Sequence, residues 1–271
     1  MSDGLPMPND PADVELARSV GEAIGGAPSP DGTPHRLDRH DLREILAAAR
    51  RSASAAGTRA VGSGRWLAGV TLETAGHLPV RDLDTLRTHH DGKAGALLSR
   101  PLIRNASLTS AAVGATTGGL AAVSQTTPAT WAAMPIELAA ETLVVVAIEM
   151  KLAAELHEAA GYAVARDLRR NGPMIARAWS ETRGLDAAEL ALLLRPGHGP
   201  TAVGTASELL GRSARDQLIN QIQRRILRRA GRNMTSFIPL MAGAVVGGTL
   251  NQRTTRRFGL QVAHTLGIDP P

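Results

Sequence analysis

The stretch Pro135–Gly161, PIELAAETLVVVAIEMKLAAELHEAAG, has the clearest helical pattern of this 271-residue chain. With a step of 100° per residue, one sector of about 100° holds the lysine and all but one of the acidic residues, while apolar side chains fill much of the rest. The residues of this sector are Glu137, Glu141, Lys151, Glu155 and Glu158. We predict a central helix with one polar stripe, beginning at Pro128 or Pro135 and ending at Gly161.

Glu149 is the acidic residue of this helix that falls outside the polar stripe, on the apolar side. A carboxylate there should be shielded, paired or placed at an interface, because an isolated buried charge is costly. The simpler expectation is a partner arginine. The alternative is a functional carboxylate with a raised pKa.

The overall composition favours an all-α fold. Aromatic residues make up 2% of the chain and hydrophobic residues 43%, so the core must be built from Ala, Leu, Val and Ile. Sandwiches and barrels draw on aromatic and β-branched residues, and no alternating run long enough for a strand is present. We predict a multi-helix bundle whose Ala- and Gly-rich central helices pack closely.

The first 36 residues differ from the rest of the chain, because they contain six prolines with scattered Gly and Asp. Such a composition buries too little apolar surface to offset the entropy of ordering. We predict a disordered arm over residues 1–36, with at most a transient helix near Val14–Ile24, and one helical domain over residues 37–271. Met1–Asp10 has no basic start and no apolar run follows it, so we expect a cytoplasmic protein rather than a secreted one.

Short helices are expected next along the chain. Asp38 or Asp41 can cap a helix that continues until Gly57 loosens it. Two further segments are expected at Trp66–Leu72, ending at Gly76, and at Pro79–His90, with proline near the first turn.

A long uncharged segment precedes the central helix. No residue between Arg104 and Glu137 is charged, and Ala106–Ser124 consists mostly of Ala, Gly, Thr and Ser. Gly114 and Gly118 have the four-residue spacing that allows close helix pairs in membranes. The segment is long enough to span a bilayer, but its polar residues dilute its hydrophobicity. Both a buried helix and a membrane-inserted or re-entrant one remain open at this point.

Positive charge is concentrated in the C-terminal quarter. Residues 205–271 carry ten basic and three acidic groups, whereas the whole chain has a formal net charge of +5. A basic amphipathic helix is expected from Ser207, and a second arginine cluster follows an uncharged segment, Asn233–Gln252. The positive-inside rule disfavours a single span between two such clusters, so a hairpin, a re-entrant dip or a protein-buried helix fits this segment better. The expected anion-binding arginines are Arg224, Arg225, Arg228, Arg229, Arg253, Arg256 and Arg257.

The sequence contains no recognisable catalytic, cofactor or metal motif. There is no cysteine, no phosphate-binding loop, no dinucleotide fingerprint and no nucleophile elbow. His89 and His90 are adjacent and point about 100° apart, so they cannot share a metal ion without other ligands. We expect no enzymatic activity, no cofactor and no metal.

Two stretches together resemble the EcsC family. The first is the central helix, which ends at Gly161-Tyr162 where the family has Tyr-Gly, and the second is IPLMAGAVVGGTLN, residues 238–251. The resemblance implies a membrane-associated protein related to one encoded beside an ABC transporter, with no settled activity and no catalytic residues to carry over. For the motif positions Gly243, Gly247 and Asn251 we expect close helix packing with a capping or interhelical hydrogen bond.

These observations give two functional hypotheses. The first is a non-enzymatic protein, peripheral or shallowly inserted at the inner face of the plasma membrane, whose arginines contact anionic lipids or an acidic protein partner. A link to a transport or envelope system is part of this hypothesis. The second is nucleic-acid binding through the same basic surface. Homo-oligomerisation through the glycine-rich faces is also open.

Overall fold

The computed structural model describes residues 10–25, 37–62, 65–124, 134–168 and 240–271, together with residues 172, 175 and 179. Within these ranges the chain forms seven α-helices and no strand, which confirms the all-α prediction. The helices are α1 (Pro11–Gly25), α2 (Arg39–Gly62), α3 (Arg65–Ala75), α4 (Leu83–His89), α5 (Gly95–Ser124), α6 (Met134–Ala159) and α10 (Leu240–Thr265), with a short 3-10 turn η2 (Ala165–Asp167).

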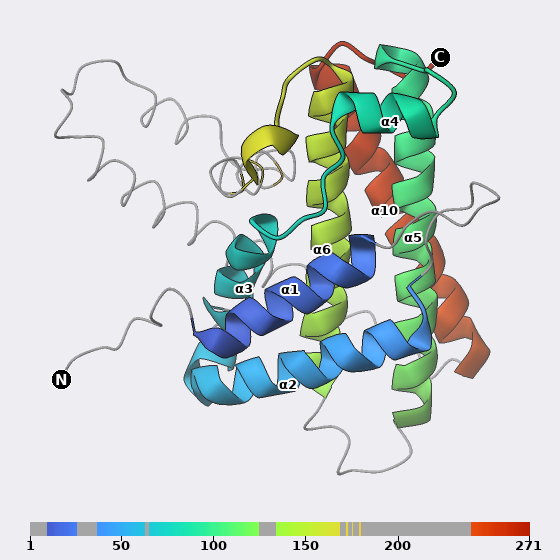
Figure 1. Cartoon of the computed structure of the whole chain (residues 1–271). Coiled ribbons are helices and arrows are strands. Elements are labelled where there is room, and N and C mark those ends of the chain that lie inside the picture. Colours follow the sequence, from blue (N-terminus) through green and yellow to red (C-terminus); the bar gives the residue numbers. More distant parts are fainter. Residues whose placement is uncertain are drawn as a thin grey trace, which may run out of the picture.

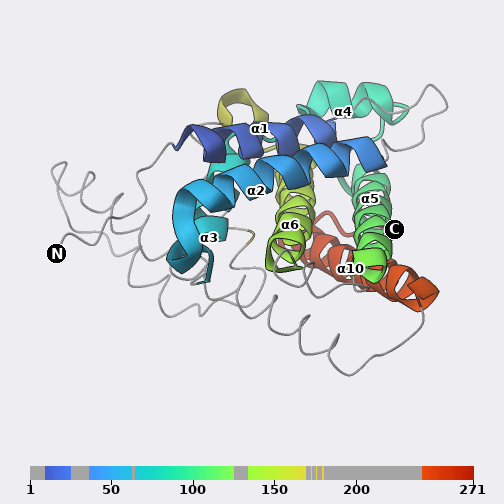
Figure 2. The ribbon, with the colours of Figure 1, turned by 90° about the horizontal axis from the view of Figure 1, so that it is seen from below.

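Helix α6 lies at the centre of the bundle and contacts each of the other six helices (Figure 1). Helices α1 and α2 cross one side of α5 and α6, and α10 covers the opposite side (Figure 2). The start of α6 at Met134 agrees with a beginning at Pro135 rather than Pro128. Its end is also as expected, because Gly161 adopts a positive φ of 94° and the Tyr162 N–H donates to the His157 carbonyl at 2.9 Å.

Helices α5 and α10 form a closely packed antiparallel pair. A Cβ added at Gly114 would lie 2.6 Å from the Gly247 carbonyl oxygen, and one added at Gly259 would lie 2.9 Å from the Ile103 side chain. Ser110 meets Thr255 between these two levels, so positions rise along α5 as they fall along α10. Small residues therefore bring the two backbones together, as the sequence predicted for the glycine-containing helices.

Capping residues determine where the short helices begin. Asp38 accepts hydrogen bonds from the backbone N–H of His40 and Asp41, and the Asp41 carboxylate accepts one from the Asp38 N–H, which is a reciprocal cap for α2. The predicted break at Gly57 is present as a kink with φ 80°.

The helix predicted over Pro79–His90 begins later than expected, at Leu83. Asp82 is its N-cap and accepts a hydrogen bond from the Thr85 N–H at 2.8 Å. Pro79 therefore precedes the helix instead of standing in its first turn. The side-chain cap fixes the start here more strongly than the proline does.

The prediction of a disordered arm over residues 1–36 is wrong for residues 11–25. They form α1, whose Leu16, Ala17 and Val20 are fully buried against the bundle. Asp10 starts the helix by accepting a hydrogen bond from the Ala12 N–H at 2.9 Å. The prolines on both sides of the helix dominate the composition of residues 1–36. The average composition of this range therefore does not reveal the 15-residue amphipathic helix within it. The helical domain accordingly begins before residue 37.

The uncharged segment predicted over Ala106–Ser124 belongs to α5. Its polar residues Ser107 and Ser110 are buried inside the protein, and the Ser107 hydroxyl donates to the Ile103 carbonyl at 2.6 Å. Among the described helices, none combines the length and the hydropathy that crossing a bilayer requires.

Candidate functional site

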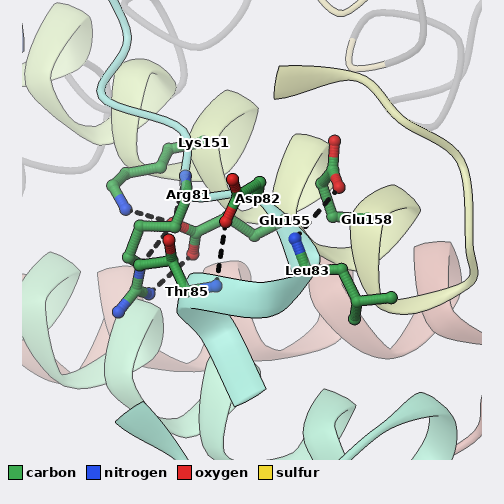
Figure 3. A network of polar contacts seen from close by, with 7 residues as sticks. All are labelled: Arg81, Asp82, Leu83, Thr85, Lys151, Glu155 and Glu158. Carbon is green, nitrogen blue, oxygen red and sulfur yellow. Dashed lines mark hydrogen bonds and ion pairs between the residues drawn. The ribbon is translucent and has the colours of Figure 1, made fainter. Parts of the chain in front are cut away.

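An ion triad of Arg81, Lys151 and Glu155 lies where the segment before α4 meets α6 (Figure 3). The guanidinium group of Arg81 donates from Nε to one oxygen of Glu155 at 2.8 Å and from its terminal nitrogen to the other at 2.9 Å. Lys151, one turn earlier on α6, donates to the same carboxylate. Two cations therefore share one buried anion and tie the α3–α4 connection to the central helix.

The charges of the ion triad are set by burial and by mutual attraction. Burial alone would raise the pKa of Glu155, but the charge of Lys151 and the hydrogen bonds from Arg81 lower it to about 2. Burial lowers the pKa of Lys151, and Glu155 offsets only part of that effect. Burial would lower the pKa of Arg81, but its hydrogen bonds to Glu155 and the negative charge of Glu155 together outweigh burial and raise that pKa.

Glu158 lies one turn beyond Glu155 and is satisfied by backbone donors. One of its oxygens accepts a hydrogen bond from the Leu83 N–H at 3.2 Å (Figure 3). The other accepts one from the Ala165 N–H at 2.6 Å. This carboxylate therefore connects the start of α4 and the chain after α6 to the same end of the central helix. Both Glu155 and Glu158 are 4% exposed, so their hydrogen bonds serve the fold.

The adjacent histidines His89 and His90 end α4 near the ion triad. Burial, followed by the nearby charge of Arg81, lowers the pKa of His90. Among the described residues, the His90 Nε2 atom is a buried nitrogen without a hydrogen-bond partner. In that part of the chain, no group of three or more His, Cys, Asp or Glu side chains is arranged to hold a metal ion.

A polar seam lies between α5, α6 and α10. We use this name for Ser110, Glu141, Glu149, Asn251 and Thr255, all of them buried. Glu149 is fully buried and accepts hydrogen bonds from Trp179 Nε1 at 2.9 Å and from the Thr255 hydroxyl at 3.1 Å. Thr255 also lies 2.9 Å from the Ser110 hydroxyl. Because a hydroxyl has a single hydrogen, Thr255 can donate to Glu149 or to Ser110 but not to both at once.

The predicted shielding of Glu149 is thus confirmed. The hydrogen bonds described for it come from an indole and a hydroxyl, and a partner arginine stays a prediction.

Asn251 makes the interhelical hydrogen bond expected of its motif position. Its amide nitrogen donates to Glu141 at 3.1 Å and joins α10 to α6. Beside it, Gly114 faces the Gly247 backbone, where a Cβ would come within 2.6 Å of both Asn251 and Gly247. Close packing and the interhelical hydrogen bond are confirmed for Asn251 and Gly247. The packing of Gly118 and Gly243, which belong to the same two helices, lies outside what the structure describes.

The described glycines of this region pack against helices of the same chain. Gly114 packs on α10, and Gly248 packs on α5, where a Cβ would lie 3.0 Å from the Ala111 carbonyl oxygen. Homo-oligomerisation through these faces therefore stays a prediction with no support from the described glycines.

The predicted anion-binding arginines fall into two groups. Arg253, Arg256 and Arg257 are exposed on α10, and we call these three the basic face. Among the described residues, no carboxylate lies within ion-pair distance of them. The other four, Arg224, Arg225, Arg228 and Arg229, lie outside the described residues.

Helix α5, which packs on α10, carries two more arginines. Arg100 and Arg104 are both exposed, and neither α5 nor α10 contains an acidic residue over 30 and 26 residues, respectively. The paired helices therefore carry five exposed arginines with no internal counter-charge.

The sequence pattern identified the carboxylates of the central helix but not the residues that contact them. It did not identify Arg81, 74 residues from Glu155, or Thr255, 106 residues from Glu149. A helical period assigns a residue to a face of its own helix and says nothing of which distant segment will cover it. Arg100 and Arg104 of α5 could have been identified from the sequence, because they are the charged residues nearest to the glycine-containing segment.

Comparison with known proteins returned no match to a family model, to a curated protein or to a solved structure.

Proposed function

We propose that the protein is a non-enzymatic, membrane-associated helical protein that binds anionic lipid headgroups at the cytoplasmic face of the plasma membrane. The observation that carries the proposal is the basic face of α10, three exposed arginines on a helix that has no acidic residue. Arg224, Arg225, Arg228 and Arg229, which precede it in sequence, would extend the same contact. The resemblance to the EcsC family supports the same function.

The physical basis is the attraction between arginine and an anionic membrane surface. Each arginine near such a surface contributes about 1 kcal/mol, so three give about a hundredfold in affinity. The carboxylates of α6 do not compete with lipid phosphates for the basic face, because they make their hydrogen bonds within the bundle. An acidic protein partner would meet the same arginines.

Nucleic-acid binding is the second candidate, favoured by the same acid-free pair of helices. Neutralised phosphates release counterions and strengthen binding to any duplex. The scarcity of aromatic side chains, 2% of the chain, leaves little for base stacking.

Co-sedimentation of the full chain with vesicles tests the proposal. At about 0.15 M salt we expect binding to vesicles of phosphatidylglycerol and phosphatidylcholine and much weaker binding to phosphatidylcholine alone. The variant R253Q/R256Q/R257Q should lose about a hundredfold in affinity. The matched control R43Q/R87Q/R166Q removes three other exposed arginines, with the same change in net charge, and should bind like the wild type.

A duplex DNA mobility-shift assay in the same buffer separates the two candidates. Equal binding to neutral and anionic vesicles would contradict the proposal. Retention of a DNA duplex at concentrations that leave anionic vesicles unbound would favour the second candidate instead.

A further inference from the structure

Four large hydrophobic side chains of the described residues are exposed, and three of them lie on the acid-free helices. Leu97, 59% exposed, and Leu108, 39% exposed, belong to α5, and Leu250, 39% exposed, belongs to α10. The fourth is Tyr162, 59% exposed, which follows α6. Exposed leucines are ordinary when scattered, but here they share two neighbouring helices with exposed arginines that have no ion-pair partner among the described residues.

The leucines and arginines of α5 form one stripe. Leu97, Arg100, Arg104 and Leu108 fall within about 80° on a helical wheel, and all four are exposed. The buried residues Leu98, Leu102 and Ile103 lie on other sides of the same turns. We call these four exposed residues the α5 stripe. Two leucines thus flank two arginines along a single outward line.

Helix α10 repeats the same spacing. Leu250, Arg253 and Arg257 are separated by three and four residues, as are Leu97, Arg100 and Arg104, and they fall within about 60° on the wheel. Their side is opposite to the one that packs on α5 and α6 through Asn251 and Thr255. Helices α5 and α10, which pack side by side (Figures 1 and 2), therefore carry the same combination of exposed leucine and arginine.

We propose that the α5 stripe is a second lipid-contacting element, whose Arg100 and Arg104 bind anionic headgroups while Leu97 and Leu108 insert at the headgroup–acyl boundary. This inference rests on the proposed function and adds a partner: a fluid anionic bilayer. The interfacial zone of a bilayer offers phosphates and apolar surface within a few ångströms of each other. A nucleic-acid backbone supplies the charge but leaves exposed leucines in water.

Pro101 limits how deeply this element can enter. Proline has no N–H, so the carbonyl of Leu97, four residues earlier, loses its helical hydrogen bond. Such a carbonyl is costly in hydrocarbon and is satisfied where water remains. The α5 stripe therefore lies at the hydrated boundary of the bilayer, in agreement with a helix that does not span it.

The chain has no cysteine, so a single labelled position can be introduced without background. Leu97→Cys, carrying an environment-sensitive fluorophore, should shift its emission to shorter wavelength when the full chain binds phosphatidylglycerol-containing vesicles. Tyr162→Cys, at an equally exposed site, is the matched control and should show no shift. The absence of a shift at position 97 while the protein is vesicle-bound would overturn the inference.

Affinity variants give a second readout on the same vesicles. L97S/L108S should bind about tenfold more weakly, and R100Q/R104Q about thirtyfold more weakly with a shallower salt dependence. Y162S and R43Q/R87Q are the matched controls, and unchanged thermal melting of each variant confirms that it is folded. Weakening by R100Q/R104Q alone would show a purely electrostatic surface and overturn leucine insertion.

The two proposals can fail separately. If the wild type does not bind anionic vesicles at all, the proposed function fails. If the wild type binds and both α5 variants bind equally well, the proposed function stands and the α5 stripe is excluded from the contact.

Discussion

Helices α6 and α10 have the same length, 26 residues, and pack on each other, yet they place their charges in opposite ways. The carboxylates of α6 at positions 141, 149, 155 and 158 are buried and hydrogen-bonded. The arginines of α10 are exposed, with no carboxylate of the described residues within ion-pair distance.

The difference separates charges that build the fold from charges available to a partner. A buried charge that loses its partner destabilises the protein strongly, whereas an exposed one contributes little to stability. Substitutions in α6 should therefore change the free energy of unfolding, and substitutions on the basic face of α10 should change binding alone. The following variants test this separation from the largest expected effect to the smallest.

Glu155→Gln should be the most destabilising change. It leaves Arg81 and Lys151 without the carboxylate that both contact, and breaking a buried ion pair in this way costs about 3–5 kcal/mol. Glu22→Gln is the matched control, because Glu22 pairs with Arg18 on the exposed side of α1. It should cost about 0–1 kcal/mol in urea unfolding. Equal effects of the two substitutions would contradict a structural role for the ion triad.

The same carboxylate predicts how stability depends on pH. The pKa of Glu155 is about 2 in the folded chain, below its ordinary value of 4.5. Its contribution, on the order of 3 kcal/mol, is therefore complete above about pH 5 and is lost as the pH falls toward 2. Urea midpoints measured from pH 7 to pH 3 should fall more steeply for the wild type than for E155Q. Parallel curves would show that Glu155 is not the group responsible.

Gly114→Ala tests the close approach of α5 and α10. The added Cβ would lie 2.6 Å from the Gly247 carbonyl oxygen, so the backbone must move. We expect a net loss of about 1–3 kcal/mol, although alanine favours the helix by about 1 kcal/mol. Gly76→Ala is the control, since its nearest neighbour would be 3.5 Å away. A stabilised G114A protein in thermal melting would exclude the tight crossing.

Thr255→Val tests the polar seam with a nearly isosteric change. It removes the hydroxyl that donates to Glu149 and should cost about 1–3 kcal/mol, because a buried acceptor loses one of its donors. Thr254→Val, at the next residue, removes a hydroxyl that bonds only locally to the Leu250 carbonyl. Its effect should be within about 0.5 kcal/mol. A larger loss for T254V than for T255V would contradict the seam.

Much of the helical framework could be predicted because its signals are local. The polar sector of α6, its end at Gly161 and the cap at Asp38 depend on residues within a few turns of one another. The shielding of Glu149 followed from its position on the apolar side. In each case the sequence neighbours determine the outcome.

What could not be predicted depends on distant contacts. The stability of α1 comes from the bundle that covers Leu16 and Val20, which the surrounding prolines do not indicate. Arg81 looked like an ordinary loop residue until the fold placed it on Glu155. The polar sector of α6 likewise gave no sign that three of its carboxylates would be buried.

The salt dependence of vesicle binding tests the central claim most directly, because it counts the arginines that meet the anionic surface. Binding of the wild type and of R253Q/R256Q/R257Q to phosphatidylglycerol-containing vesicles is measured between about 0.05 and 0.3 M salt, alongside urea unfolding of both proteins. We predict that the triple variant binds about a hundredfold more weakly with a shallower salt dependence, while its unfolding midpoint stays that of the wild type. A variant with the affinity and salt dependence of the wild type would contradict the claim that the outward arginines of α10 bind the membrane.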